Sequence, residues 1–114
     1  MLATLTKGRR HERRAARMLR RHGLKILARN VRAGRDEIDL VARDADVVVV
    51  VEVRHRKRDR LAADLSVDRA KAARLRRAWG RLARDLGIPL ATRVRFDLVL
   101  SADDWSMSWH RGVL

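Results

Sequence analysis

Five consecutive valines, Val47 to Val51, constrain the fold of this chain more than any other feature. A further valine, Val53, follows after Glu52, and β-branched side chains favour extended backbone. Apolar residues at every position, rather than at every second one, are typical of a strand that is covered on both faces. The run therefore predicts a central, doubly buried strand, with other elements packed against both sides of it.

The length of the chain limits the architecture around this strand. The sequence has 114 residues, of which 46% are hydrophobic, so we expect one domain over residues 1–114 with one core. No apolar run approaches the roughly 20 residues of a membrane span, and residues 1–10 turn basic too early for a signal peptide. The absence of cysteine excludes disulfides, thiolate metal sites and cysteine nucleophiles, and favours a cytoplasmic protein.

The remaining elements follow from periodicity and from residues that stop helices. Helical spacing of apolar residues predicts a helix over residues 7–22, with Thr6 as its N-cap and Gly23 as its stop. Further elements are strands over 24–31, 37–43 and 93–100, a basic loop over 55–60, a helix over 68–86 capped by Asp68, and a short edge strand within 105–110. The order α-β-β-β-α-β predicts an α/β domain with a mixed central sheet flanked by helices.

Charge indicates the kind of partner. The chain has 28 Lys and Arg against 14 Asp and Glu, a formal net charge of +14. A domain this basic attracts polyanions, so we expect a nucleic acid as partner, with an anionic membrane surface as the alternative. The arginine-rich faces of both predicted helices would be solvated and would also attract DNA without sequence preference.

Glutamate is scarce and its positions are unusual. The chain has only three, Glu12, Glu37 and Glu52. Glu12 precedes Ala16 by four residues and Leu19 by seven, so it shares the apolar face of the first predicted helix. A role in a site and an intrahelical ion pair with Arg9 or Arg13 are both compatible with this position.

The second and third strands should form a hairpin centred between Ala45 and Asp46. In that register opposed residue numbers sum to 91, and directly opposed Cβ atoms lie about 4.5–5.5 Å apart. One face then carries Glu37 and Asp39 opposite Arg54 and Glu52, and the core face carries Ile38, Leu40, Val51 and Val53. Two opposed carboxylates repel unless a positive group lies between them, either a divalent cation or Arg54.

Mg²⁺ prefers a few oxygen ligands completed by water. Asp39, Glu52 and a backbone carbonyl near Val53 would supply them, and Glu12 could add a third acid. Such a metal polarises a phosphodiester, and Arg54 would align the attacking water or stabilise developing charge. The alternative is a charge-paired hairpin without metal, in which Asp39 pairs with Arg54 and Glu37 with Arg32 or Arg35.

At these residues the sequence resembles the YraN-like family, small bacterial proteins with a restriction-endonuclease-like fold. The resemblance covers nearly the whole chain. The matching positions are Gly8, Glu12, Ala16 and Leu19; Gly23-Leu24 and Asn30-Val31-Arg32; Glu37-Ile38-Asp39-Leu40-Val41; Val51-Glu52-Val53-Arg54; Val67 and Lys71; Arg95-Phe96-Asp97; and Trp109-His110.

The resemblance implies a nuclease-type site. In active members of this fold a helix acid, a strand Asp and a strand Glu bind metal, roles that map to Glu12, Asp39 and Glu52. A lysine usually follows the Glu by two residues, where this chain has Arg54. Arginine cannot serve as a base near neutrality, so Arg54 can replace the lysine only if that residue orients water or neutralises charge.

Other residues have predicted roles around this site. Phosphate contacts are expected from His55, Arg56, Lys57, Arg58 and Lys71. His11, His22 and His110 are expected at the surface, because no two histidines have ligand spacing. Trp79 is predicted in the core, Asp97 to pair with Arg95 or Arg93, and Trp105 and Trp109 to cover the sheet edge or to stack on bases.

Three functions compete on these grounds. The first is a Mg²⁺- or Mn²⁺-dependent endonuclease acting on structured or branched DNA, which could work as a homodimer because a branched junction needs two cuts. The second is a nucleic-acid-binding module that kept the fold and lost catalysis, as Arg54 would suggest. The third is a basic membrane-surface or protein-interaction protein, which the short, Ala-rich apolar face of the first helix disfavours.

Overall fold

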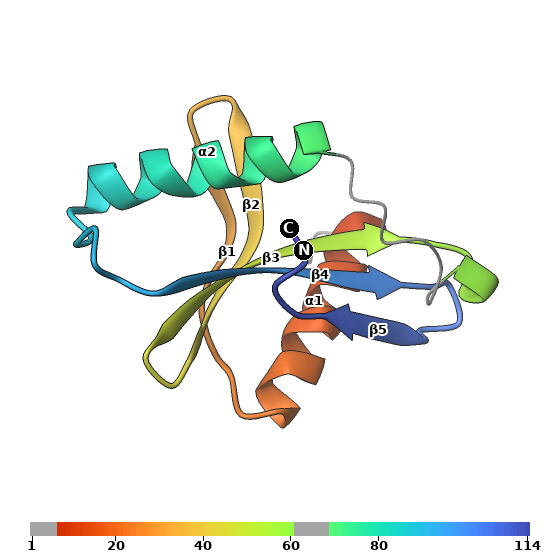
Figure 1. The fold of residues 1–114 in the computed structure, drawn as a ribbon. Coiled ribbons are helices and arrows are strands. Elements are labelled where there is room, and N and C mark those ends of the chain that lie inside the picture. The colour runs from red at the N-terminus through yellow and green to blue at the C-terminus, as the bar shows by residue number, and fades with distance from the viewer. Residues whose placement is uncertain (1–6, 61–68) are drawn as a thin grey trace, which may run out of the picture.

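The computed structural model describes residues 7–60 and 69–114, which form two helices, five strands and one turn of 3₁₀ helix (Figure 1). In chain order the elements are α1 (Lys7–Arg21), β1 (Lys25–Ala33), β2 (Asp36–Asp44), β3 (Val47–His55), η1 (Arg58–Arg60), α2 (Arg69–Leu86), β4 (Val94–Ser101) and β5 (Met107–His110). Thr6 and Asp68, the predicted helix caps, and Val67 lie outside the described residues. The predicted loop over 55–60 is wrong in part, because β3 continues to His55 and η1 follows.

The five strands form one mixed sheet in the order β1-β2-β3-β4-β5. The first three pair antiparallel, β4 runs parallel to β3, and β5 returns antiparallel along the edge (Figure 1). A parallel neighbour requires a crossover, which α2 supplies. The predicted α/β architecture, its element order and its edge strand are therefore confirmed.

The β2–β3 hairpin has the predicted register over its paired length. Leu40 pairs with Val51 and Asp44 with Val47, and Ala45 in the turn has a positive φ of 53°. Backbone pairing between these two strands ends at Leu40, before Asp39 and Glu52. The Val53 N–H donates instead to Asp39 Oδ2 at 2.8 Å, so a side chain takes the place of a strand partner.

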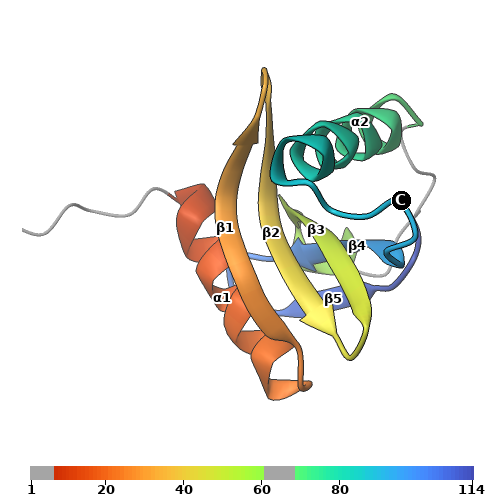
Figure 2. The same ribbon diagram turned by 90° about the vertical axis from the view of Figure 1, so that its left-hand side faces the viewer.

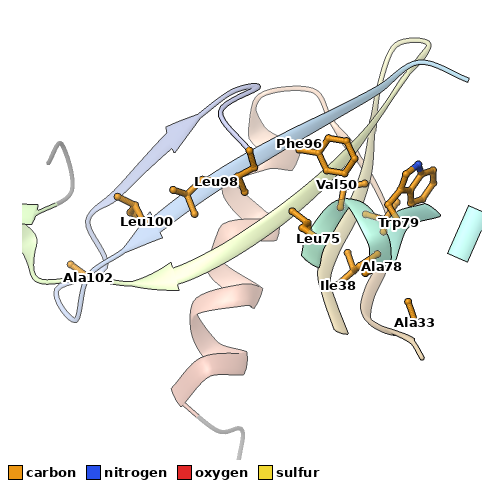
Figure 3. Close-up of a cluster of buried hydrophobic side chains, with 12 residues drawn as sticks. Ala33, Ile38, Val50, Leu75, Ala78, Trp79, Phe96, Leu98, Leu100 and Ala102 are labelled. Atoms are coloured by element: carbon orange, nitrogen blue, oxygen red, sulfur yellow. The ribbon is translucent and has the colours of Figure 1, made fainter. Parts of the chain in front are cut away.

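The two helices cover opposite faces of the sheet (Figure 2). Val49 and Val51 pack with α1 side chains such as Leu19, whereas Val50 packs with α2 side chains, including Leu75 and Trp79 (Figure 3). All three of these valines have 0% exposure. The doubly buried central strand and the core position of Trp79 are thus both confirmed.

One part of the predicted core face is wrong. Ile38 was expected beside Leu40, but it packs in the α2 cluster while Leu40 packs in the α1 cluster. The β1–β2 pairing passes from Arg29 with Leu40 to Val31 with Ile38 and leaves out Asn30 and Asp39; Asn30 itself has a left-handed backbone with φ 53°. Pairing between β2 and β3 also ends at Leu40. Asp39 therefore lies where the hairpin changes the face that it presents to each helix.

Within residues 7–60 and 69–114, neither α1 nor α2 is long and apolar enough to cross a bilayer.

Candidate metal and nucleic-acid site

Glu12 and Asp39 come together on the α1 side of the hairpin. Glu12 projects from α1, and Asp39 from the point where β2 leaves β3. A hydrogen bond from Glu12 and the negative charge of Glu52 both act on Asp39. Glu12 Oε2 is buried and has no hydrogen-bond partner among the described residues. The fold thus leaves one carboxyl oxygen of this pair available to a ligand.

Both carboxyls hold their protons unusually tightly. Burial, followed by the charge of Asp39, raises the pKa of Glu12 from 4.5 to about 7. Burial raises the pKa of Asp39 from 3.8 to about 6, although the hydrogen bond from Val53 N–H opposes the rise. Two such groups side by side favour either a shared proton or a bound cation over two free negative charges.

Glu52 lies next to this pair but is held by arginines. Arg54 Nη2 donates to Glu52 Oε2 at 2.6 Å, and Arg74 Nη2 of α2 lies 3.6 Å from Oε1. The side chains of Glu52 and Arg54 are each only 15% exposed. Arg54 therefore pairs with Glu52, and not with Asp39 as the metal-free alternative had it.

The three acids do not form a ready-made cage. Among residues 7–60 and 69–114, three possible metal-ligating atoms lie within 4.8 Å of one another only in His11, His55 and Asp103. The structure brings Glu12 to Asp39 and keeps Glu52 on Arg54 and Arg74. A cation shared by all three would have to draw Glu52 away from its arginines.

Positive charge surrounds the acids. A cavity beside Glu12 is lined by Arg9, Arg13, Arg29 and Asn30. The predicted phosphate-binding residues lie near the carboxyl end of β3, where His55, Lys57 and Arg58 are exposed, and Arg56 is half-buried. Lys71 lies in the first turn of α2 and is half-buried. Basic side chains from α1 and β1 thus line the cavity at Glu12, and a second basic group follows the end of β3.

His11 is the residue that the sequence interpretation misplaced. It was expected at the surface, but it is 2% exposed, and its Nδ1 lies 2.6 Å from Ser101 Oγ. Burial, followed by the charge of His55, lowers the pKa of His11 below 6.5. The signal was present, because His11 precedes Ala15 by four and Leu19 by eight residues, on the buried stripe of α1.

Asp97 is the fully buried acid of β4. Its carboxylate accepts two hydrogen bonds from Arg95, one from Trp109 Nε1 and one from Gly112 N–H. The predicted Arg95 pairing is confirmed, and Trp109 on β5 covers the sheet edge. These contacts tie β4, β5 and the C-terminal segment together, which is a structural role.

The raised pKa values predict how stability changes with pH when no divalent metal is present. Between about pH 4 and about pH 7 the folded protein keeps protons on Glu12 and Asp39 that the unfolded chain has released. The folded state then binds more protons, so the contribution of both groups to the free energy of unfolding falls as the pH rises. As the pH rises from about 4 to about 7, the free energy of unfolding of Asp39→Asn should therefore increase relative to that of wild type. Urea unfolding at a series of pH values measures this difference.

A matched control for that series is Asp46→Asn in the exposed β2–β3 turn, where Asp46 Oδ2 meets Arg93 at 3.4 Å. Asp46 is exposed, so this substitution should alter the dependence of the free energy of unfolding on pH less than Asp39→Asn does. An Asp39→Asn profile parallel to that of wild type would contradict the assignment.

The element order, the mixed sheet and the acids at the β2–β3 divergence define a small α/β protein with the architecture expected of a restriction-endonuclease-like core. Residues 11–100 match the uncharacterised protein family UPF0102, and the chain belongs to this family. It is 41% identical to the UPF0102 protein BAV3162 of Bordetella avium, over 92% of this chain and 72% of that protein. It is also 36% identical to a UPF0102 protein of Kosmotoga olearia, over 96% and 94% of the two chains, and 43% identical to one of Halorhodospira halophila, over 92% and 84%. Membership agrees with the resemblance to YraN-like proteins.

Proposed function

We propose that this protein binds nucleic acid and hydrolyses phosphodiester bonds in structured DNA, using Mg²⁺ or Mn²⁺. The observation that carries the proposal is the half-buried Glu12–Asp39 pair, in which partial burial raises both pKa values and the buried Glu12 Oε2 has no hydrogen-bond partner among the described residues. Perturbed carboxyls beside a basic surface are typical of functional sites. Cutting both arms of a branched junction would require two copies of the site, so we expect a homodimer.

The side chains fit the ions proposed. Mg²⁺ and Mn²⁺ favour oxygen ligands, and Glu12 Oε2 is a buried oxygen without a partner among the described residues. Glu12 and Asp39 would hold the ion, and Glu52 would join them if released from Arg54. A metal held there would polarise the phosphodiester and lower the pKa of the attacking water.

The residues of the chain itself have separate tasks. The Val53 N–H holds Asp39 in place through its 2.8 Å hydrogen bond. Arg54 and Arg74 place two guanidinium groups at Glu52, where they can neutralise charge but cannot accept a proton near neutral pH. Arg56, Lys57, Arg58 and Lys71 would hold the phosphate backbone, a salt-sensitive attraction without sequence preference.

The direct test is a calorimetric titration of Mn²⁺ into wild type and Asp39→Asn, alongside cleavage assays on a four-way DNA junction and on a linear duplex. We expect one Mn²⁺ per chain in wild type, at least about a tenfold weaker association in Asp39→Asn, and cleavage only with metal. Asp46→Asn serves as the control and should behave like wild type. Cleavage of no DNA or RNA substrate with either metal would overturn the enzymatic proposal.

A second candidate is a nucleic-acid-binding module without catalysis. The observation that favours it is the Glu52–Arg54 ion pair at 2.6 Å, which occupies a carboxylate that the nuclease needs. This candidate requires DNA binding that weakens steeply with salt, together with no affinity for Mn²⁺. The Mn²⁺ titration therefore separates the two functions.

A further inference from the structure

A second group of metal-ligating side chains lies at the carboxyl ends of the parallel strands β3 and β4, which point the same way in Figure 1. His55 ends β3 and pairs in register with Ser101, the last residue of β4. Asp103 follows two residues later, and α1 brings His11 to the same place. These segments, far apart in sequence, place three ligand atoms within 4.8 Å of one another.

His11 is oriented as metal-bound histidines usually are. One ring nitrogen, Nδ1, lies 2.6 Å from the buried Ser101 Oγ, which fixes the orientation of the ring. The other, Nε2, is buried without a hydrogen-bond partner among the described residues and lies 4.0 Å from Asp103 Oδ1. In metal sites the second nitrogen of a ligating histidine is generally held by such an outer partner. The tautomer with its proton on Nδ1 leaves a lone pair on Nε2 directed at the cluster.

The other two side chains complete a three-sided arrangement. His55 Nε2 lies 2.9 Å from Asp103 Oδ1, and the His11 and His55 rings have centroids 5.0 Å apart. Lys7 Nζ also meets Asp103 Oδ1, at 3.0 Å, so a cation already occupies one side of this carboxylate. His55 and Asp103 are 41% and 67% exposed, which leaves them free to adjust around the rigid His11.

We propose that His11, His55 and Asp103 bind a divalent transition-metal ion of the Zn²⁺ type. Two imidazoles and a carboxylate suit Zn²⁺, Co²⁺ or Ni²⁺ and not Mg²⁺, which prefers oxygen alone. Tetrahedral bonds of about 2.0–2.2 Å would separate the ligand atoms by roughly 3.3 Å. In the structure Asp103 Oδ1 lies 2.9 Å from His55 Nε2 and 4.0 Å from His11 Nε2, one shorter and one longer than that value. Three protein ligands leave a fourth position open to water or to an anionic oxygen.

This site differs from the Glu12–Asp39 pair because two of its three ligands are nitrogen atoms and it shares no side chain with that pair, and it does not depend on the proposed nuclease function. Its ligands come from α1, β3 and the segment after β4. A bound ion would therefore tie α1 to the end of the sheet, and it should raise the thermal midpoint of the whole domain.

The test is a calorimetric titration of Zn²⁺ into the chelator-treated full chain, with thermal melts and Co²⁺ absorption spectra of the same samples. We expect one Zn²⁺ per chain, a higher melting temperature with Zn²⁺, and the visible Co²⁺ bands of a four-coordinate site. His55→Gln and Asp103→Asn should each weaken Zn²⁺ association by about a hundredfold or more. Both side chains are exposed, so these variants should fold, as circular dichroism would verify.

Two comparisons make the result decisive. His22→Gln removes an exposed histidine outside the cluster, whose Nδ1 contacts Met18 O, and should bind Zn²⁺ like wild type. Asp39→Asn, which lowers Mn²⁺ affinity under the proposed function, should leave Zn²⁺ binding intact. The proposal is overturned if wild type binds no Zn²⁺, or if His55→Gln and Asp103→Asn bind it as tightly as wild type. Loss of Zn²⁺ binding in Asp39→Asn, with those two variants unaffected, would also refute it.

Discussion

Glu52→Gln is expected to abolish metal-dependent cleavage of branched DNA while the protein still binds that DNA. The amide keeps the size of the side chain and removes the negative charge with which Glu52 would help to hold a metal ion. Loss of one such electrostatic group in an active site typically lowers kcat by about 10²–10³-fold. Single-turnover cleavage rates and a binding isotherm on the same junction would measure both effects.

The matched control is Glu37→Gln on β2, an exposed glutamate of the same hairpin. It makes the same chemical change and should reduce cleavage by no more than about twofold, because its charge acts on Glu12 and Asp39 only as a minor influence. Equal losses in the two variants would show that the total negative charge of the hairpin, and not a site at Glu52, determines the cleavage rate. Cleavage retained in Glu52→Gln would remove Glu52 from the site.

Asp97→Ala is expected to destabilise the domain by about 3–5 kcal/mol, a large part of the stability of a typical domain. Asp97 has 0% exposure, and its loss would leave the Arg95 guanidinium, Trp109 Nε1 and Gly112 N–H without their common acceptor. Urea unfolding followed by tryptophan fluorescence measures the change. If Asp97→Ala does not fold, the isosteric Asp97→Asn should still show a lowered urea midpoint.

Asp44→Ala provides the comparison, because it removes the other carboxylate that contacts Arg95. Asp44 Oδ2 lies 3.3 Å from Arg95 Nη1, and the Asp44 side chain is 40% exposed. A partly exposed ion pair contributes about 1 kcal/mol or less, so the urea midpoint should change little. Similar losses in the two variants would contradict a special role for the buried acid.

Most of the fold could be predicted from local patterns. The valine run specifies a strand buried on both faces, and the packing of Val49 and Val50 against different helices confirms it. The hairpin register was also predictable, because the turn at Ala45 and Asp46 determines which residues pair. The face of Ile38 was not predictable, because strand pairing is interrupted at Asp39, between Leu40 and Ile38, and no local pattern in β2 indicates that interruption.

The candidate acid site was predictable only in part. Glu12 on an apolar helical stripe and Asp39 opposite Glu52 on the hairpin both indicated a site for acids, and the structure brings Glu12 and Asp39 together. That Arg74 joins Arg54 at Glu52 depends on how α2 crosses the sheet, which the pattern of α2 alone does not specify.

Local periodicity, turn residues and composition were enough to predict the order of strands and helices, the central strand, the hairpin register and the basic character of the chain. Which side chains come into contact depends instead on how the helices and strands pack together. His55 lies 44 residues after His11, and Asp103 lies 48 residues after His55. The three converge because the parallel strands β3 and β4 end side by side, where α1 supplies His11. No local pattern encodes such a meeting, since its distances are set by how whole elements pack.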